Sequence, residues 1–492
     1  MYAVRAIGWP LIGGRDLDEY VYDYVQFFDW HPVLPWSMLF RTPATALVLG
    51  PALDVAGGFF AEPLLAVLFA GSVVAWAAAA RAFGVRTALV VALALLVYPA
   101  YGLMFHELSS EPVFCAAFAL WAWLVVRAAH RPTVGRFAAA GLGVALMAFV
   151  RPGNVLLVAA ALFALAVRGS WRRRAQWVAA FVAAALLPLA GWAVLNGLRF
   201  DDYTLARGGN AVIPFYRAFI TDRIVSPDNG PASRRLAKAV RMHLLTHNPY
   251  KGYHVTVHQV FTSGSFRIHE DLYVLSDRVF GWDTNYSVLR QAGVEAVEQH
   301  PHAYTSGVLH TVWQQLSRSY FRSPPARGAS APRQGSAASL RPPTEGEPIP
   351  AGQNVWISRP DNCITDVWTS PARHHFSFCN ARVHRQFAAV IRERDELFAA
   401  VPDRSGSATL RLWLNRLSRW FPRSLLWLAL GLVALVVRRP RGGAILVTLA
   451  LAGLLVIVFN ALGLFADPHF ALPVAPAFVL FGAGALLGPR SR

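Results

Sequence analysis

The chain has 492 residues, of which 55% are hydrophobic and only 15% are charged. Soluble proteins carry about 25% charged residues, so this composition excludes an ordinary soluble enzyme. The formal net charge of +18 could indicate nucleic-acid binding. However, the basic residues cluster beside apolar segments, as they do when they set membrane topology. Nearly all are arginine, since lysine occurs only at Lys238 and Lys251, and this bias is typical of GC-rich bacterial genomes.

Several apolar runs are candidates for membrane-spanning helices, which need roughly 20 residues. They cover residues 58–83, 87–105, 109–129, 137–150, 154–167, 176–198, 425–437, 444–465 and 470–487. Tilt or local thinning of the bilayer can accommodate the shorter runs. The predicted fold class is an all-α polytopic membrane protein, a transmembrane helix bundle with a mixed, mainly helical segment outside the membrane.

The loops between these runs alternate in charge. Arginine-rich loops form one set, at 81–86, 127–136, 168–174 and 438–441 with the tail 490–492. The other set comprises residues 13–57, 106–107, 151–153, 199–421 and 466–469. Because positively charged loops stay in the cytoplasm, we predict that the second set lies on the outer face of a bacterial plasma membrane.

Four carboxylates lie close together in the first outward loop, at Asp16, Asp18, Glu19 and Asp23. Carboxylates beside hydrocarbon are costly and are usually functional, although an N-cap or a solvated surface would also explain them. Their oxygens could hold a metal ion, but the spacing matches no known metal-binding loop. We therefore predict no cofactor, with a divalent metal as the alternative.

Composition divides the chain into four regions. Residues 1–57 hold the N-terminus and the acidic loop, 58–198 the first part of the bundle, 199–421 the outward segment and 422–492 the last spans. Within the outward segment, residues 323–353 are rich in Pro, Ala, Ser and Gly and predict a flexible loop. Residues 410–421 predict an amphipathic interfacial helix. The apolar stretch 1–12 is too short to span a membrane. We expect that a first span is missing from this sequence, and the alternative is that the chain starts outside the bilayer.

The three cysteines give a further prediction about the outward side. Cys115 lies in an apolar run and is interpreted as a small buried side chain. Cys363 and Cys379 lie in the outward segment, where an oxidising compartment would favour a disulfide between them. Two unpaired thiols are the equally supported alternative.

Five motifs occur in an informative order: DEYVYDYVQFF, FRTPATALVLGP, FHELSSEPVF, FVRPGNVLL and DPHFALPVAPAF. Together they resemble the polyprenyl-phosphate-sugar-dependent glycosyltransferases of the GT-C superfold. The resemblance is to the branch that contains protein O-mannosyltransferases and the lipid A aminoarabinose transferase. It implies transfer of a hexose or pentose from a polyprenyl-phosphate donor to an envelope glycan, lipid or protein outside the cytoplasm.

The resemblance also implies roles for individual residues. Asp18 is the expected catalytic base, with Asp16 as its rival and Glu19 as a helper. Donor phosphate is expected at Arg151 and at His469, where many members have arginine. The residues expected to bind acceptor or substrate are Tyr22, His106, Glu107 and Glu111. Arg41 is interpreted as an interfacial anchor, and one base opposite the leaving group predicts inversion at the anomeric carbon.

Two other classes of function remain open at this point. A transporter or lipid flippase would place ionisable residues at mid-span and often has repeated halves, whereas the acids here lie at span ends. A catalytically inactive scaffold for envelope synthesis is the other alternative, because the expected first span is absent. Nucleotide-sugar chemistry is disfavoured, since the sequence has no Gly-rich phosphate loop.

Overall fold

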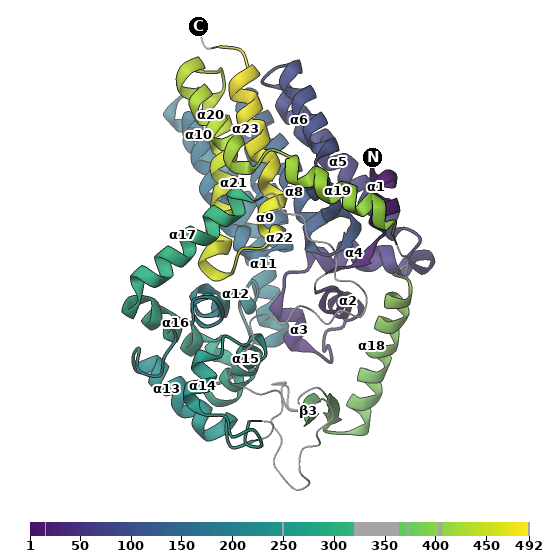
Figure 1. Cartoon of the computed structure of the whole chain (residues 1–492), viewed down its shortest axis with the longest axis vertical. Coiled ribbons are helices and arrows are strands. Elements are labelled where there is room, and N and C mark those ends of the chain that lie inside the picture. The colour runs from purple at the N-terminus through teal and green to yellow at the C-terminus, as the bar shows by residue number, and fades with distance from the viewer. Residues whose placement is uncertain (15, 248–249, 319–363, 371–372, 402–405, 491–492) are drawn as a thin grey trace.

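A bundle of long helices and a cap of shorter helices make up the computed structural model, which describes residues 1–14, 16–247, 250–318, 364–370, 373–401 and 406–490. The C-terminus lies at one end of the bundle, and the helices of the outward segment gather at the other end (Figure 1). The predicted fold class, an all-α polytopic bundle with a mainly helical outer segment, is confirmed. The predicted loop at 323–353 lies outside the described residues.

Within the described residues, six stretches are long and apolar enough to cross a membrane. They are α5 (Ala61–Arg81), α8 (Ser110–His130), α11 (Trp171–Phe200), the pair α19 (Ala408–Trp420) and α20 (Ser424–Arg438), α21 (Gly443–Gly463), and residues 468–487 with α22 (Pro468–Ala471) and α23 (Ala475–Leu487). A bent pair, α6 (Val85–Val97) and α7 (Pro99–Leu103), would make a seventh span. The chain is thus a multi-pass membrane protein.

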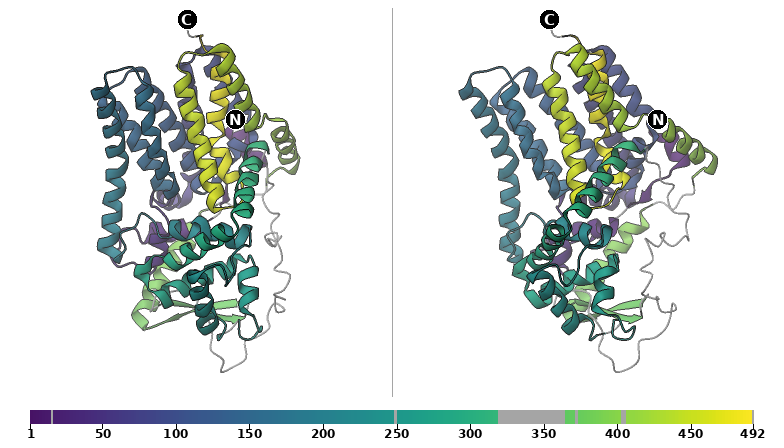
Figure 2. Two further views of the ribbon diagram at one scale, coloured as in Figure 1. Left: turned by 90° about the vertical axis from the view of Figure 1, so that its left-hand side faces the viewer. Right: turned by 60° about the vertical axis from the view of Figure 1, so that its left-hand side comes forward.

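Shorter apolar helices complete the bundle and account for the short runs of the sequence. They are α4 (Ala44–Asp54), α9 (Val134–Val150), and the 3₁₀ segment Pro152–Leu162 with α10 (Phe163–Ala166). Figure 2 shows α9 and α11, in blue, running side by side at one edge of the bundle. The apolar runs predicted from the sequence therefore all fall on helices of this bundle.

The bend between α6 and α7 has a visible cause. Pro99 has no N–H to donate, so carbonyl groups at the end of α6 lack helical partners. Arg5, from the short helix α1 (Tyr2–Gly8), is 2% exposed and donates to the carbonyl oxygens of Leu96 and, at 3.5 Å, Tyr98. A buried cation thus caps the C-terminal end of α6, as favoured by the helix dipole.

Contacts at the two ends of the bundle match the predicted alternation of loops. At the C-terminal end, the N–H of Arg441 donates to the carbonyl of Pro489 at 2.8 Å, so the loop after α20 meets the tail. At the opposite end, Arg151 contacts both Ser110 and the carbonyl of His469. Which end faces the outside of the cell stays a prediction.

The outward segment forms its own core. Its helices are α12 (Gly208–Ala211), α13 (Pro231–Ala239), α14 (Val257–Thr262), α15 (Phe266–Phe280), α16 (Ser287–Gln299) and α17 (Pro301–Ser317), with π-helical segments Val212–Thr221 and Val240–Leu244. Buried Phe215, Leu236, Leu272 and Leu289 pack between them. An antiparallel hairpin, β3 (Ile364–Ser370) and β4 (Arg373–Phe378), leads into α18 (Ala381–Ala399). The sequence did not predict this hairpin.

Arg217 joins the outward segment to the bundle. It is 1% exposed and forms a bidentate pair with Asp222, with N–O distances of 2.8 and 3.0 Å. Its remaining nitrogen donates to the carbonyls of Ala461 (2.8 Å) and Leu464 (2.9 Å) at the end of α21. One guanidinium therefore satisfies a carboxylate in the outward segment and free carbonyls of a membrane helix.

We expect Arg217→Lys to destabilise the protein by about 1–3 kcal/mol, because an ammonium cannot reproduce the planar fork. Thermal unfolding in detergent would measure the loss, and limited proteolysis would show whether the outward segment is released first. Exposed Arg241, on the same segment, provides the control: Arg241→Lys should leave both readouts unchanged. Equal stability of the two variants would contradict the anchoring role.

His269 lies in an aromatic cage inside the outward segment. It is 1% exposed, and the nearest ring centroids belong to Tyr273 (4.6 Å) and Tyr216 (4.8 Å), with Phe215 at 5.8 Å. Burial lowers its pKa from 6.5 to about 3, because the imidazolium would lose its hydration there. The folded protein therefore keeps this histidine neutral.

This burial predicts acid sensitivity of the outward segment. Between pH 6.5 and 3 the unfolded chain binds a proton at His269 that the folded chain does not, so the stability present above pH 6.5 is lost as the pH falls. The loss at pH 5 should be roughly 2 kcal/mol. Unfolding of His269→Phe, compared with wild type at pH 7 and pH 5, should lack this contribution. The exposed control His243→Gln should retain it.

Candidate active site

The acidic helix is fixed against the start of a membrane span. Strand β1 (Ile12–Gly13) pairs in parallel with β2 (Glu107–Leu108), and the N–H of Gly14 donates to the carbonyl of Leu108 at 3.2 Å. A Cβ on Gly14 would lie 2.7 Å from the Cβ of Ser109, so only glycine allows this approach. Helix α2 (Leu17–Val25) begins directly afterwards, which places its carboxylates beside α8.

Arg41 neutralises two of the four carboxylates. It follows α3 (Pro35–Phe40) and contacts Asp16 (Nη1–Oδ2 3.2 Å) and Glu19 (Nε–Oε2 2.5 Å). Its guanidinium also lies 5.3 Å from the ring centroid of Tyr20. The interpretation of Arg41 as a simple interfacial anchor is therefore corrected: it is an ion-pair partner inside the acidic cluster.

The other two carboxylates differ sharply in their surroundings. Asp23 is 4% exposed, and the hydroxyl of Ser37 donates to it at 2.8 Å. Burial raises the pKa of Asp23 well above its ordinary value, and the Ser37 hydrogen bond offsets only part of this. Asp18 is exposed and forms no hydrogen bond or ion pair with any described residue. Asp18 is thus the accessible carboxylate of the cluster.

Tyr22, predicted to contact substrate, is shielded by α18. It is 8% exposed, and Arg394 of α18 donates to its hydroxyl at 2.5 Å while lying 5.1 Å above its ring. Phe387 and Val390 of the same helix belong to its apolar surroundings. Tyr22 therefore joins α18 to the acidic helix.

A second charged cluster lies at the start of α8. Arg151 forms an ion pair with Glu111 and donates two hydrogen bonds to the hydroxyl oxygen of Ser110, at 3.0 and 3.1 Å. It also donates to the carbonyl of His469 at 3.1 Å. Arg151 is 18% exposed and Glu111 is 8% exposed. The ion pair with Glu111 compensates the charge of Arg151, and phosphate binding by Arg151 stays a prediction.

His469 lies between two carboxylates. Its Nε2 is 3.1 Å from Glu107, and its Nδ1 is 2.5 Å from Asp467. Asp467 also accepts from the backbone N–H of His469 at 2.9 Å. A carboxylate next to each ring nitrogen favours the protonated, positively charged form of a histidine. The surroundings of His469 therefore suit a cationic side chain.

His106 is buried behind these groups. It is 2% exposed, its ring stacks on Tyr2 at 4.2 Å, and neither ring nitrogen has a hydrogen-bond partner among the described residues. With Glu107 and His469 it lines a small pocket of about 40 Å³. The structure thus groups His106 with two other predicted site residues, although its access to solvent is limited.

The two clusters meet at Tyr20 and Ser110. Burial raises the pKa of Tyr20, and the nearby Arg41 and Ser110 offset part of the rise. Since Ser110 also contacts Arg151, a chain of polar contacts links the acidic helix to the second cluster. Sequence reasoning assigned no role to Tyr20 or Ser110, although both lie inside the quoted motifs.

The sequence also made predictions about a metal ion and a disulfide. Among the described residues no three His, Cys, Asp or Glu side chains converge as a metal site requires. Cys379 is disulfide-bonded and Cys115 is free and buried. Cys363 lies outside the described residues, so its pairing stays a prediction.

Comparison with known proteins supports the resemblance. Residues 57–192 match the family described as dolichyl-phosphate-mannose-protein mannosyltransferase. The search of curated proteins finds no match. Two similar solved structures are those of ArnT from Cupriavidus metallidurans, bound to undecaprenyl phosphate and in the apo state. They share 12% identity with the chain, cover 98% and 99% of it and 75% of their own length, and have TM-scores of 0.34 and 0.33.

The family match covers the first part of the helix bundle, from just before α5 into α11. The predicted resemblance to GT-C proteins is confirmed for residues 57–192, the part of the chain that the family match covers. This part resembles the branch of the protein mannosyltransferases.

Proposed function

We propose that the chain is an integral-membrane glycosyltransferase. It transfers a sugar from a polyprenyl-phosphate-linked donor to an acceptor on the extracytoplasmic face of a bacterial plasma membrane. The observations that support this proposal are the accessible carboxylate of Asp18, on the helix that also carries Glu19, the partner of Arg41, and the ion pair between Arg151 and Glu111. The family match over residues 57–192 supports the same class of reaction.

The base is Asp18. An acceptor hydroxyl must lose its proton as its oxygen attacks the anomeric carbon, and an accessible carboxylate can take that proton. Asp16 and Glu19 serve this role less well, because Arg41 occupies them, and Asp23 is buried. A single base opposite the leaving group gives one displacement and hence inversion.

The leaving group is a polyprenyl phosphate, which departs as an anion and needs cations rather than an acid. Arg41 and Arg151 supply planar guanidinium groups that match phosphate oxygens. Each now pairs with a carboxylate, so donor binding exchanges one anionic partner for another and leaves the charge of the site compensated. His469, which contacts Glu107 in the second cluster, is the third candidate.

The proposed function is tested by measuring how the protein consumes the lipid-linked sugar donor. Purified protein in lipid nanodiscs is supplied with polyprenyl-phosphate mannose or arabinose, and release of polyprenyl phosphate is measured with and without an envelope extract as acceptor. We expect release to require the protein, to survive EDTA and to yield an inverted linkage by NMR. No release from either donor, with transport of the intact lipid instead, would favour the flippase alternative.

A further inference from the structure

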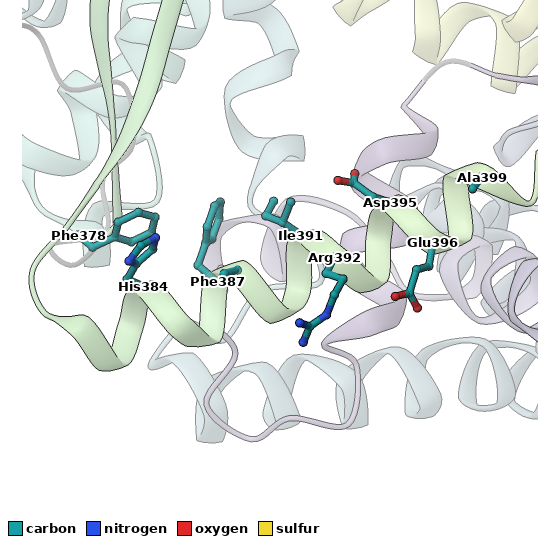
Figure 3. Close-up of a pocket in the computed structure, with 9 residues that line it drawn as sticks. Phe378, His384, Phe387, Ile391, Arg392, Asp395, Glu396 and Ala399 are labelled. Atoms are coloured by element: carbon teal, nitrogen blue, oxygen red, sulfur yellow. The ribbon is translucent and has the colours of Figure 1, made fainter.

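The exposed side of α18 and the end of β4 form an open groove of about 720 Å³, the α18 groove (Figure 3). Aromatic rings line one end of it. The ring of His384 stacks on Phe378 with centroids 4.5 Å apart, and Phe378 lies 5.3 Å from Phe387. Ala388 and Ile391 continue the apolar floor along the helix.

The other end of the α18 groove is charged. Arg392, Asp395 and Glu396 line it and are all exposed, and Figure 3 shows them farther along the helix than the rings. Rings that pack against apolar C–H faces, beside carboxylates and a guanidinium that bond hydroxyl groups, are the combination that a sugar chain requires. An acyl chain would press hydrocarbon against these exposed charged groups and remove part of their hydration, which is costly.

Helix α18, which carries the groove, packs against α2, the helix of the candidate base. Arg394, the neighbour of Asp395, donates to the Tyr22 hydroxyl. On α2, Tyr22 and Asp18 are four residues apart, so they lie on the same side of the helix, about 6 Å apart along its axis. Figure 1 places α18 beside α2 and away from the long helices of the bundle, which also disfavours a lipid tail as occupant.

We propose that the α18 groove binds the acceptor and that the acceptor is a glycan chain. This inference rests on the proposed function, because it assigns the second substrate of that same reaction. The rings hold sugar units at one end, and the charged end directs the terminal hydroxyl towards Asp18. The carboxylate then removes the proton of that hydroxyl, as described above.

Two neighbouring alanines allow a matched test. Ala388 lines the groove, whereas Ala389 is exposed but does not line it. Ala388→Trp fills the groove, and Ala389→Trp adds the same side chain beside it. The probes are linear tri- to hexasaccharides of mannose, arabinose and glucose, and binding to protein in nanodiscs is measured by saturation-transfer NMR and calorimetry.

We expect oligosaccharides of one of the three sugars to bind wild type and Ala389→Trp with equal affinity. They should bind Ala388→Trp about tenfold or more weakly, the effect of losing an important contact position in an interface. In the transfer assay, Ala388→Trp should raise KM for the glycan, whereas Ala389→Trp should leave it at the wild-type value. The proposal is overturned if no oligosaccharide binds wild type, if both variants bind alike, or if Ala388→Trp impairs transfer only to a peptide or lipid. Failure of the proposed function shows separately, as absence of donor turnover in wild type.

Discussion

Asp18→Asn is expected to lower the rate of sugar transfer by about 10²–10⁴-fold, the contribution of a positioned general base. The amide keeps the shape of the side chain but cannot take a proton. Because Asp18 is exposed and has no partner among the described residues, the change should leave thermal unfolding and membrane insertion unaltered. Initial rates of polyprenyl phosphate release at saturating donor would measure the effect.

Asp16→Asn is the matched control for this variant. Asp16 lies two residues away and pairs with Arg41 at 3.2 Å, so its loss should alter donor binding more than the chemical step. We therefore expect KM for the donor to rise and kcat to change little. If Asp16→Asn abolishes transfer while Asp18→Asn is active, the base is Asp16, the competing assignment from the sequence.

Arg151→Met is expected to destabilise the protein by about 3–5 kcal/mol, because it leaves the carboxylate of Glu111 without its cation in a largely buried place. Glu111 is 8% exposed, and the Ser110 hydroxyl would lose the same partner. Thermal unfolding in detergent would show the loss, and transfer would fall in parallel.

A double variant separates stability from phosphate binding. Arg151→Met combined with Glu111→Leu removes both charges, and such replacements are often neutral for stability. We expect the double variant to unfold near the wild-type temperature but to remain deficient in transfer, with a raised KM for the donor. If transfer also recovers, Arg151 acts as a structural link alone and the phosphate assignment fails.

Much of the membrane architecture was predictable from the sequence. Apolar length and composition identify spans because a bilayer admits only helices with internally satisfied backbones. The arginine-rich loops gave the alternation that the contacts of Arg441 with Pro489 and of Arg151 with Ser110 now match. The bend at Pro99 was hidden inside one apolar run, because hydropathy does not register a change of direction.

The candidate site was predicted only in part. The predicted alternation of loops placed Glu107, Arg151 and His469 on the same side of the membrane, near Glu111. In the structure these four residues form one cluster. The role of Arg41 was missed, because an arginine near a span usually anchors the interface and nothing local indicates that its side chain turns towards α2. The shielding of Tyr22 by α18 was equally hidden, since those residues are hundreds of positions apart.

The sequence by itself determined that this protein is a multi-pass helix bundle with acids at the ends of its spans, because apolar length and charge act locally along the chain. Only the tertiary structure decided the state of each acid. The four carboxylates look alike in the sequence but differ in the structure. Asp18 is accessible, Asp16 and Glu19 pair with Arg41, and Asp23 is buried. The physical reason is that burial and ion pairing depend on neighbours brought by α3, α8 and α18, which no local pattern of the acidic loop encodes.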